Sequence, residues 1–341
     1  MPALPSVKEI KLDHLPNALS AYNVCLAFEK EANTEQSRLH ARILGYLIIH
    51  APSSTALAEI VKVIHSCAQD HKTLSELGES FLIWFIRPFK NKGRTPTPSD
   101  HPSRPSFKAD LEAMIKGAPK DHKEAKKQAL VRDGCRCVVT GKYDVIAEKE
   151  SLVDVNVILA AGGSVHTELA HILPEPTHFN VSDSRTNSPE KNDYAASVLV
   201  VLQHFGYDVE KVNGPKVHSL YNVMTMEKNV HDWFDRLEMW FESTGVENCY
   251  RLQTILRSYQ VPGEVTFTSP DYSVLQYPSQ QLLALHAACA KVAHLSGAGE
   301  YIDKFDRDAD DLDVLATDGS SSAILTHALS KPSSRSISIG A

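Results

Sequence analysis

The segment at positions 87–106, RPFKNKGRTPTPSDHPSRPS, most constrains what this chain can fold into. Proline fixes φ and lacks a backbone N–H, so a cluster of prolines interrupts a helix and is excluded from the interior of a sheet. The serines and basic residues around the prolines are typical of an exposed connection. The sequence therefore predicts a linker over 91–106 that divides the 341 residues into two parts.

The first part has the pattern of a helical domain over 1–90. Apolar residues recur at three-and-four spacing in LSAYNVCLAFEKEA, QSRLHARILGYLIIHA, STALAEIVKVIHSCAQ and SELGESFLIWFI, which is the period of an amphipathic helix. Ser53 or Ser54 is suited to begin one helix, because a serine hydroxyl accepts a hydrogen bond from a backbone N–H of the first turn. The pattern indicates a helical bundle but not what the bundle does.

Composition excludes several classes of protein. The six cysteines form no CxxC pair, and Cys135 and Cys137 are only one residue apart, so neither a disulfide framework nor a zinc ribbon is indicated. No apolar run approaches the roughly 18 residues that span a membrane. The first residues contain no apolar segment of the secretory kind. We expect an intracellular protein, in the nucleus or the cytoplasm, that is not secreted.

The second part mixes helical and strand patterns and predicts an α+β fold. A helix over 107–132, which Gly117 and Pro119 break in two, precedes a short strand in CRCVVTG and a segment, SLVDVNVILA, that fits a strand or a helix. A helix over 194–206 follows, then strands in NCYRLQTI and GEVTFTS and a helix in QLLALHAACAKVAHLSG. The tail over 301–341 is acidic and then rich in serine, which predicts disorder.

The stretch NVMTMEKNVHDWFDRLEMWFE, residues 222–242, has a pattern that suits a metal ion. Asn222 stands nine positions before His231, and Asp235 lies four residues after it. Residues four apart share one face of a helix, so both side chains can point at one divalent cation. Taken alone, an amphipathic helix with an exposed His–Asp pair is the more common explanation. Apolar residues are expected to anchor this helix: Trp233, Phe234, Leu237, Trp240 and Phe241.

The stretch ELAHILP places His171 at the end of an expected strand, where Pro174 turns the chain. An isolated histidine of this kind is more often a core residue than a general base. Its place between CVVTG and the later Asn–His–Asp pattern is what makes His171 a candidate catalytic residue.

In this order, RDGCRCVVTGKYD, ELAHILP and LYNVMTMEKNVHDWFDRLEMWFE resemble the HNH nuclease domain, a ββα-metal fold, and in particular the HNH domains of uncharacterised fungal proteins. The resemblance covers about 132–250. It implies that an HNH nuclease-like domain with insertions occupies 107–300. It also implies that the helix over 194–206 is inserted between the two strands of that domain.

The resemblance implies a role for each matching residue. His171 corresponds to the general base that activates water, and Asn222 to the residue that braces the loop between the second strand and the helix. His231 corresponds to a metal ligand, and Asp235 to a further ligand that the colicin nucleases have one turn on. The implied cofactor is a divalent metal (Mg²⁺, Mn²⁺, Ni²⁺ or Zn²⁺), and the implied partner is nucleic acid, with DNA favoured. We expect His171 to face the His231–Asp235 pair across a bound phosphate.

One position departs from the pattern of the family. Ala170 stands where active relatives have Asp, Glu or His as a metal ligand directly before the first histidine. Glu168 lies three residues before His171, and on an extended strand we expect it on the opposite face. Three histidines are alternative ligands, although each also fits an ordinary surface residue: His166, His178 and His218.

Charge is unevenly distributed along the chain. The formal net charge is −7 at pH 7, yet Lys and Arg outnumber Asp and Glu between Arg87 and Lys142. On charge alone, a solvated linker and helix face is the more common explanation. With the nuclease resemblance, a basic segment of this kind becomes a candidate for contact with the DNA backbone. The candidate residues are Lys120, Lys123, Lys126, Lys127, Arg132 and Arg136.

Three hypotheses follow from the sequence. The first is a metal-dependent HNH endonuclease that hydrolyses phosphodiester bonds, with the helical domain serving targeting or assembly. The second is a degenerate HNH scaffold that binds nucleic acid or protein without cutting. It is suggested by Ala170, which stands where a metal ligand is expected. The third is a structural interaction protein in which the helical domain matters most.

Overall fold

The computed structural model describes residues 2–10, 12, 15–90, 117–174 and 189–310, and the predicted linker over 91–106 lies outside them. The chain forms two compact units. The first consists of the described residues within 1–88, 179–207 and 291–341, and the second of those within 89–178 and 208–290. The predicted domains instead run straight along the chain. The division differs because α10 (Pro189–His204) and α13 (Ala298–Asp310) pack with the N-terminal helices.

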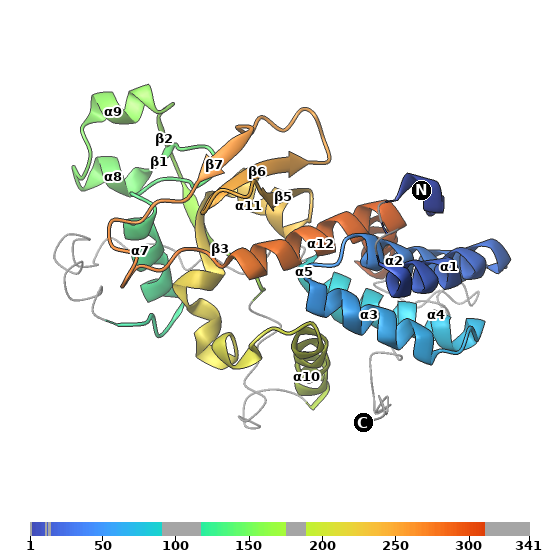
Figure 1. Ribbon diagram of the computed structural model, residues 1–341. Coiled ribbons are helices and arrows are strands. Elements are labelled where there is room, and N and C mark those ends of the chain that lie inside the picture. Colours follow the sequence, from blue (N-terminus) through green and yellow to red (C-terminus); the bar gives the residue numbers. More distant parts are fainter. Residues whose placement is uncertain (1, 11, 13–14, 91–116, 175–188, 311–341) are drawn as a thin grey trace. The chain divides into compact units, whose positions relative to one another are not determined.

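The first unit is helical, as its apolar spacing predicts. It begins with η1 (Val7–Glu9), α1 (Pro16–Glu31), α2 (Glu35–Ile49), α3 (Ser54–Ser66), α4 (His71–Phe81) and the π-helix η2 (Leu82–Ile86), and the chain continues into α5 (Arg87–Phe89). Figure 1 shows α1 to α4 packed side by side as a bundle. The side chains of Thr34, Ser53 and Asp70 accept hydrogen bonds from the first turns of α2, α3 and α4, which fixes where these helices begin.

Two later helices complete this unit. Directly after α10, the ring of Phe205 packs against Phe81 and Phe85, with ring centroids 6.1 and 5.4 Å away. An ion pair of 3.2 Å between Arg87 and Asp306 holds α13. The sequence predicted a flexible tail from 301, whereas residues 298–310 form this helix.

The second unit combines short helices with small sheets. In chain order it contains α7 (His122–Arg132), β1 (Tyr143–Asp144), α8 (Val145–Lys149), α9 (Val155–Ala160), β2 (Ser164–Val165), β3 (Thr167–His171), η4 (Val209–Lys211), η5 (Gly214–His218), η6 (Leu220–Asn222), β4 (Val223–Glu227), α11 (Lys228–Asp235), β5 (Met239–Ser243), β6 (Cys249–Thr254) and β7 (Glu264–Thr266). Helix α12 (Gln280–Ser296) follows. Strand β1 pairs with β2 in parallel, whereas β3–β4 and β5–β6–β7 are antiparallel.

The β3–β4 hairpin is the centre of the second unit. Its register places Glu168 opposite Met226 and His171 opposite Val223. Helices α7 and α11 both pack against the two strands. A buried apolar cluster joins α7 to the hairpin: Ala125, Ala129, Leu169, Leu220, Val223 and Leu275. Burying this cluster removes apolar area from water, worth about 25 cal/mol per Å², and holds the hairpin on α7.

Two elements differ from the sequence prediction. CRCVVTG forms a tight turn with one isolated bridge between Arg136 and Tyr143, rather than a strand. Cys135 has a φ of 57°, in the left-handed region that a strand does not use. Helix α11 ends at Asp235 instead of extending through the stretch of aromatic residues, because Leu237 takes a φ of 62° and the chain then enters β5.

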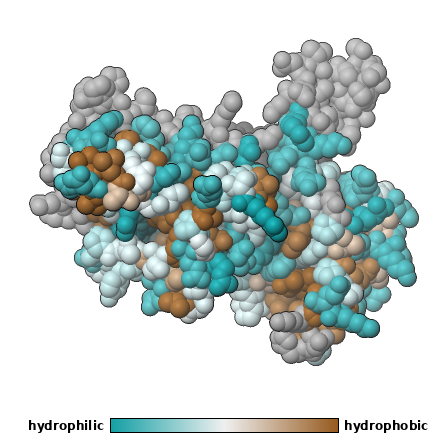
Figure 2. Space-filling model, turned by 90° about the horizontal axis from the view of Figure 1, so that it is seen from above, coloured by the Kyte–Doolittle hydropathy of each residue, from teal (hydrophilic) through white to brown (hydrophobic). Residues whose placement is uncertain are grey.

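The surface mixes polar and apolar side chains. On the face drawn in Figure 2, apolar residues are scattered among hydrophilic ones. The short helix α9 exposes Val155, Val157 and Leu159 and buries Ile158. Within the described part of the chain, no helix has the length and apolar character needed to cross a membrane.

Candidate functional site

The alternation of side chains along β3 sorts the candidate residues onto two faces. Leu169 packs with Ala125 and Ala129 of α7, so the Leu169 side of the strand faces α7. Glu168 contacts His231 of α11, so its side of the strand faces α11. Because alternate residues of a strand share a face, Ala170 lies on the Glu168 side and His171 on the Leu169 side.

His231 is held between two carboxylates. Its Nδ1 lies 2.9 Å from Oε2 of Glu168, and its Nε2 lies 3.4 Å from Oδ2 of Asp235. The side chains of the three residues are 18–25% exposed, so this group, the Glu168–His231–Asp235 triad, is sheltered but reached by solvent. A carboxylate on one ring nitrogen fixes the tautomer and the orientation of an imidazole, which is how ligands to metals are commonly held.

The triad shifts the pKa values of its members. Burial by itself lowers the pKa of His231, but hydrogen bonds and charges from Asp235 and Glu168 outweigh it and raise that pKa to about 9. The hydrogen bond from His231 lowers the pKa of Glu168 despite its partial burial, and the positive charges of His231, Lys228 and Lys126 act in the same direction. At neutral pH and without a metal, His231 is therefore an imidazolium that pairs with carboxylates.

The chemistry of the triad fits a divalent metal in part. His231 and Asp235 offer an imidazole nitrogen and a carboxylate oxygen, both suited to a hard or borderline cation. Ala170, which is fully buried on the same face, offers a methyl group where a third donor is expected. Across the residues that the structure describes, no group of three or more His, Cys, Asp or Glu side chains is arranged to hold a metal ion.

Asn222 is fully buried and bonds to the segments on both sides of the hairpin. Its Oδ1 accepts from the N–H of Leu173, and its Nδ2 donates to the carbonyls of Leu173 and Val217 at 3.0 and 2.9 Å. Its backbone carbonyl also accepts from the N–H of Ile172. The bracing role expected for Asn222 thus corresponds to contacts with the chain just after His171, rather than with the loop that enters α11.

His171 lies in a cluster of three histidines from three elements. Its Nε2 is 3.1 Å from Nδ1 of His218, which ends η5. The ring of His122, the first residue of α7, lies 5.9 Å from that of His171 and 6.0 Å from that of His218. His171 and the His231–Asp235 pair thus lie on opposite faces of β3, which is not the facing arrangement that the sequence predicted. Their convergence on one phosphate stays a prediction, which the variants below test.

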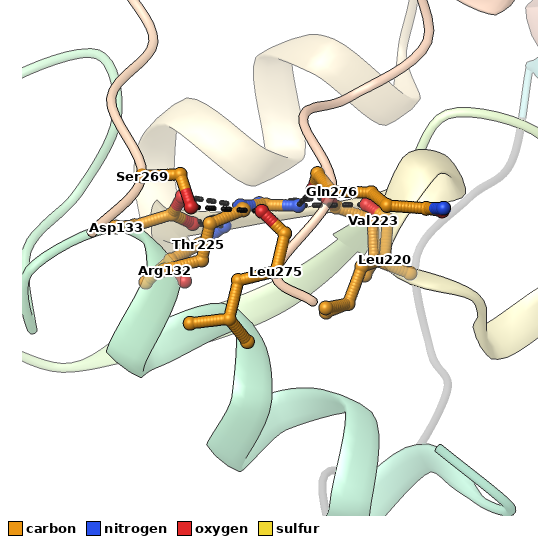
Figure 3. A network of polar contacts seen from close by, with 8 residues as sticks. All are labelled: Arg132, Asp133, Leu220, Val223, Thr225, Ser269, Leu275 and Gln276. Carbon is orange, nitrogen blue, oxygen red and sulfur yellow. Dashed lines mark hydrogen bonds and ion pairs between the residues drawn. The ribbon is translucent and has the colours of Figure 1, made fainter. Parts of the chain in front are cut away.

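Arg132 was expected to contact a DNA backbone, and the structure excludes this role because its guanidinium is buried and occupied. Its nitrogen atoms donate to both carboxylate oxygens of Asp133 and to the carbonyls of Leu220, Val223 and Gln276. Figure 3 shows this network, in which Asp133 also accepts from the N–H of Thr225. Arg132 fixes the beginning of β4 instead.

The other basic candidates are accessible. Lys120, Lys123 and Arg136 are exposed, and Lys126 and Lys127 are half-buried on α7. Lys126 is also close enough to Glu168 to lower its pKa. These residues remain candidates for nucleic-acid contact.

Two residues of the site were underestimated from the sequence. The sequence placed Glu168 on the face of the strand away from His171, and the structure agrees. The same alternation puts Glu168 on the face of Ala170, where a metal ligand is expected. His218 was expected at the surface, whereas it is 8% exposed and contacts His171. Of the other alternative ligands, His166 is exposed and His178 lies outside the described residues. The spacing from Glu168 to Ala170 was a usable signal, whereas His218 had none.

Comparison with known proteins bears on this region of the chain. Neither the curated proteins nor the solved structures include a match, so the finer resemblance to fungal HNH domains is not tested. The hairpin, Asn222, His231 and Asp235 all lie within residues 137–242, and these residues match the family model described as HNH endonuclease.

Proposed function

We propose that this protein is a divalent-metal-dependent HNH endonuclease that hydrolyses phosphodiester bonds of nucleic acid. The match of residues 137–242 supports a nuclease-like function in general. The observation that carries the finer proposal is the Glu168–His231–Asp235 triad, in which a hairpin strand orients an imidazole toward a carboxylate of the following helix.

His231 and Asp235 would hold the metal, and Glu168 would orient His231 through Nδ1. A bound divalent ion supplies charge stabilisation for the phosphoryl oxygens and the leaving oxygen. The protein must release the proton of the His231 imidazolium before Nε2 can act as a ligand, because a metal and a proton compete for the same lone pair. Metal affinity should therefore rise with pH.

His171 would act as the general base. It is the last residue of β3 and is only partly buried, so water can approach its ring. An unperturbed imidazole titrates near pH 6.5, which suits proton transfer from water at neutral pH. Asn222 would keep this residue in place by bonding the chain two residues further on. The accessible basic residues of α7 and Arg136 would contact the backbone of the nucleic acid.

The test is nicking of supercoiled plasmid DNA with Mg²⁺, Mn²⁺, Ni²⁺ or Zn²⁺. We expect His171→Ala to lower the rate at least 100-fold, since general base catalysis typically contributes about 10²–10⁴-fold. Asp235→Asn should weaken binding of Mn²⁺, measured by calorimetry, because it removes a charged donor. His166→Ala is the matched control, an exposed histidine just before the same strand that should cut like the wild type. A wild type that is inert with all four metals refutes the proposal.

The degenerate scaffold is the second candidate, and buried Ala170 favours it. In that case the His231 imidazolium itself occupies the place of a metal between two carboxylates. An inert wild type that becomes active on Ala170→Asp supports this candidate, with a urea titration to show that the variant is folded. Cutting by the wild type eliminates it.

A further inference from the structure

The His171–His218 pair is a contact that the HNH pattern does not require. Nε2 of His171 and Nδ1 of His218 are 3.1 Å apart, with ring planes inclined at 62°. His218 enters from η5, in the long connection between β3 and β4. His122 packs edge-on to His218 and tilted against His171, so α7 supports the pair from a third side.

Asn222 fixes the separation of the two histidines. One amide bonds to Leu173, two residues after His171, and to Val217, directly before His218. The amide is completely buried, so each of its hydrogen bonds is costly to break, because a buried partner left unsatisfied loses its contact with water as well. The two rings are thus held together by the backbone that carries them as well as by their own contact.

A hydrogen bond between two imidazole nitrogens needs one proton, so one ring donates and the other accepts. If His171 donates through Nε2, its Nδ1 carries the lone pair and can take a proton from water. If His218 donates, Nε2 of His171 is occupied as the acceptor and Nδ1 carries a proton, which leaves His171 without a basic nitrogen. Only the first arrangement is compatible with a general base.

We propose that His218 is the positioning residue of His171: it accepts the Nε2 proton, holds the tautomer in which Nδ1 is basic, and stabilises the imidazolium that forms. This inference rests on the proposed function. When His171 takes a proton from water at Nδ1, the hydroxide bonds to phosphorus as the bond from phosphorus to the leaving oxygen breaks, and that oxygen takes a proton from solvent. The Nε2–H of His171 stays hydrogen-bonded to Nδ1 of His218 throughout. His218 thus orients His171, which in turn activates the attacking water, as a third group orients the base in other activated nucleophile sites.

The direct test is long-range ¹⁵N–¹H NMR of the wild-type protein with ¹⁵N-labelled histidine, which reports the protonated nitrogen of each ring. We expect His171 as the Nε2–H tautomer and His218 with an unprotonated Nδ1. An Nδ1–H tautomer of His171 overturns the proposal, whether or not the protein cuts DNA. Stoichiometric Zn²⁺ binding that shifts the nitrogen signals of both rings also overturns it, since the cluster is then a metal site.

The functional test compares two substitutions of His218. His218→Leu removes the acceptor and should lower kcat for nicking with little change in KM. We expect a loss of about 10- to 100-fold, the size found for residues that orient the ligands of a metal without touching it. His218→Asn places an amide oxygen near the position of Nδ1 and should restore most of the loss. His166→Asn serves as the control. Equal loss in both His218 variants, or an unchanged His171 tautomer in His218→Leu, contradicts the positioning role. A wild type that cuts no DNA refutes the proposed function, while the tautomer measurement still decides which of His171 and His218 donates the hydrogen bond.

Discussion

At the scale of single residues, Arg132 is a buried charge whose hydrogen-bond donors have acceptors within the protein. The guanidinium is 1% exposed, yet its donors are matched by Asp133 and three carbonyl groups. Because it joins the end of α7 to the chain on both sides of Asn222, it supports the hairpin that carries the candidate catalytic residues.

We expect Arg132→Leu to lower the free energy of unfolding of the second unit by about 3–5 kcal/mol, since it leaves Asp133 buried without its partner. Urea denaturation measures the loss. Lys123→Leu on the exposed face of the same helix is the control and should change the free energy by less than about 0.5 kcal/mol. Equal effects of the two substitutions would show that the network contributes nothing specific.

At the scale of elements, α4 approaches α2 closely at Gly78. A Cβ atom there would lie 2.5 Å from the Cβ of His40 and 3.0 Å from its carbonyl oxygen. The glycine permits a helix contact that any side chain would open, and the two helices are part of the core of the first unit.

Gly78→Ala should therefore destabilise the first unit by about 1–3 kcal/mol, the usual cost of overpacking. Helix propensity alone predicts the opposite sign, a gain of about 1 kcal/mol. Thermal unfolding decides between them. Glu76→Ala, exposed on the same helix, tests propensity without the close contact. An increase in stability for Gly78→Ala would mean that the helices can move apart freely.

Most elements of this fold were predictable where a single local signal decides. The helices of the first unit, α10, α12, β6 and β7 follow from periodicity and caps. The end of α11 did not, because apolar spacing continues through Trp240 and only the left-handed turn at Leu237 stops the helix. The partner of His171 was also out of reach, since His218 meets it through tertiary packing alone. For Glu168, the spacing to Ala170 indicates the face of the strand, but only the packing of α11 shows that its partner is His231.

At the scale of the whole molecule, each unit buries a neutral histidine. Burial lowers the pKa of His40 to about 4 in the first unit and that of His286 to about 3 in the second. His286 Nε2 donates to the carbonyl of Phe234, and its ring stacks on that of Phe234 with centroids 3.7 Å apart. A folded-state pKa below the unfolded value means that the unfolded chain binds more protons as pH falls through about 6.5.

His40 and His286 should therefore each take away about 2 kcal/mol of stability between pH 8 and pH 5, because each pKa unit is worth 1.36 kcal/mol. The raised pKa of His231 acts in the opposite direction in the second unit, so the contribution of His286 is read from its own substitution. Urea midpoints at the two pH values measure this. His286→Gln keeps a donor for Phe234 but does not titrate, and should remove this contribution from the second unit. His65→Gln, at an exposed position of the first unit, is the control for the loss of an imidazole. A His286→Gln variant with the wild-type acid response refutes the assignment.

The buried amide of Asn222 also bears on where the polypeptide can be divided. It links Leu173, just after β3, to Val217, shortly before β4, so both ends of the connection between these strands are held together. The strands themselves pair along their whole length. Covalent continuity across that connection is then unnecessary for the hairpin. Two halves of the protein, produced separately with a break between Pro174 and Pro189, should associate and re-form the β3–β4 hairpin, which makes this chain a natural starting point for a split protein.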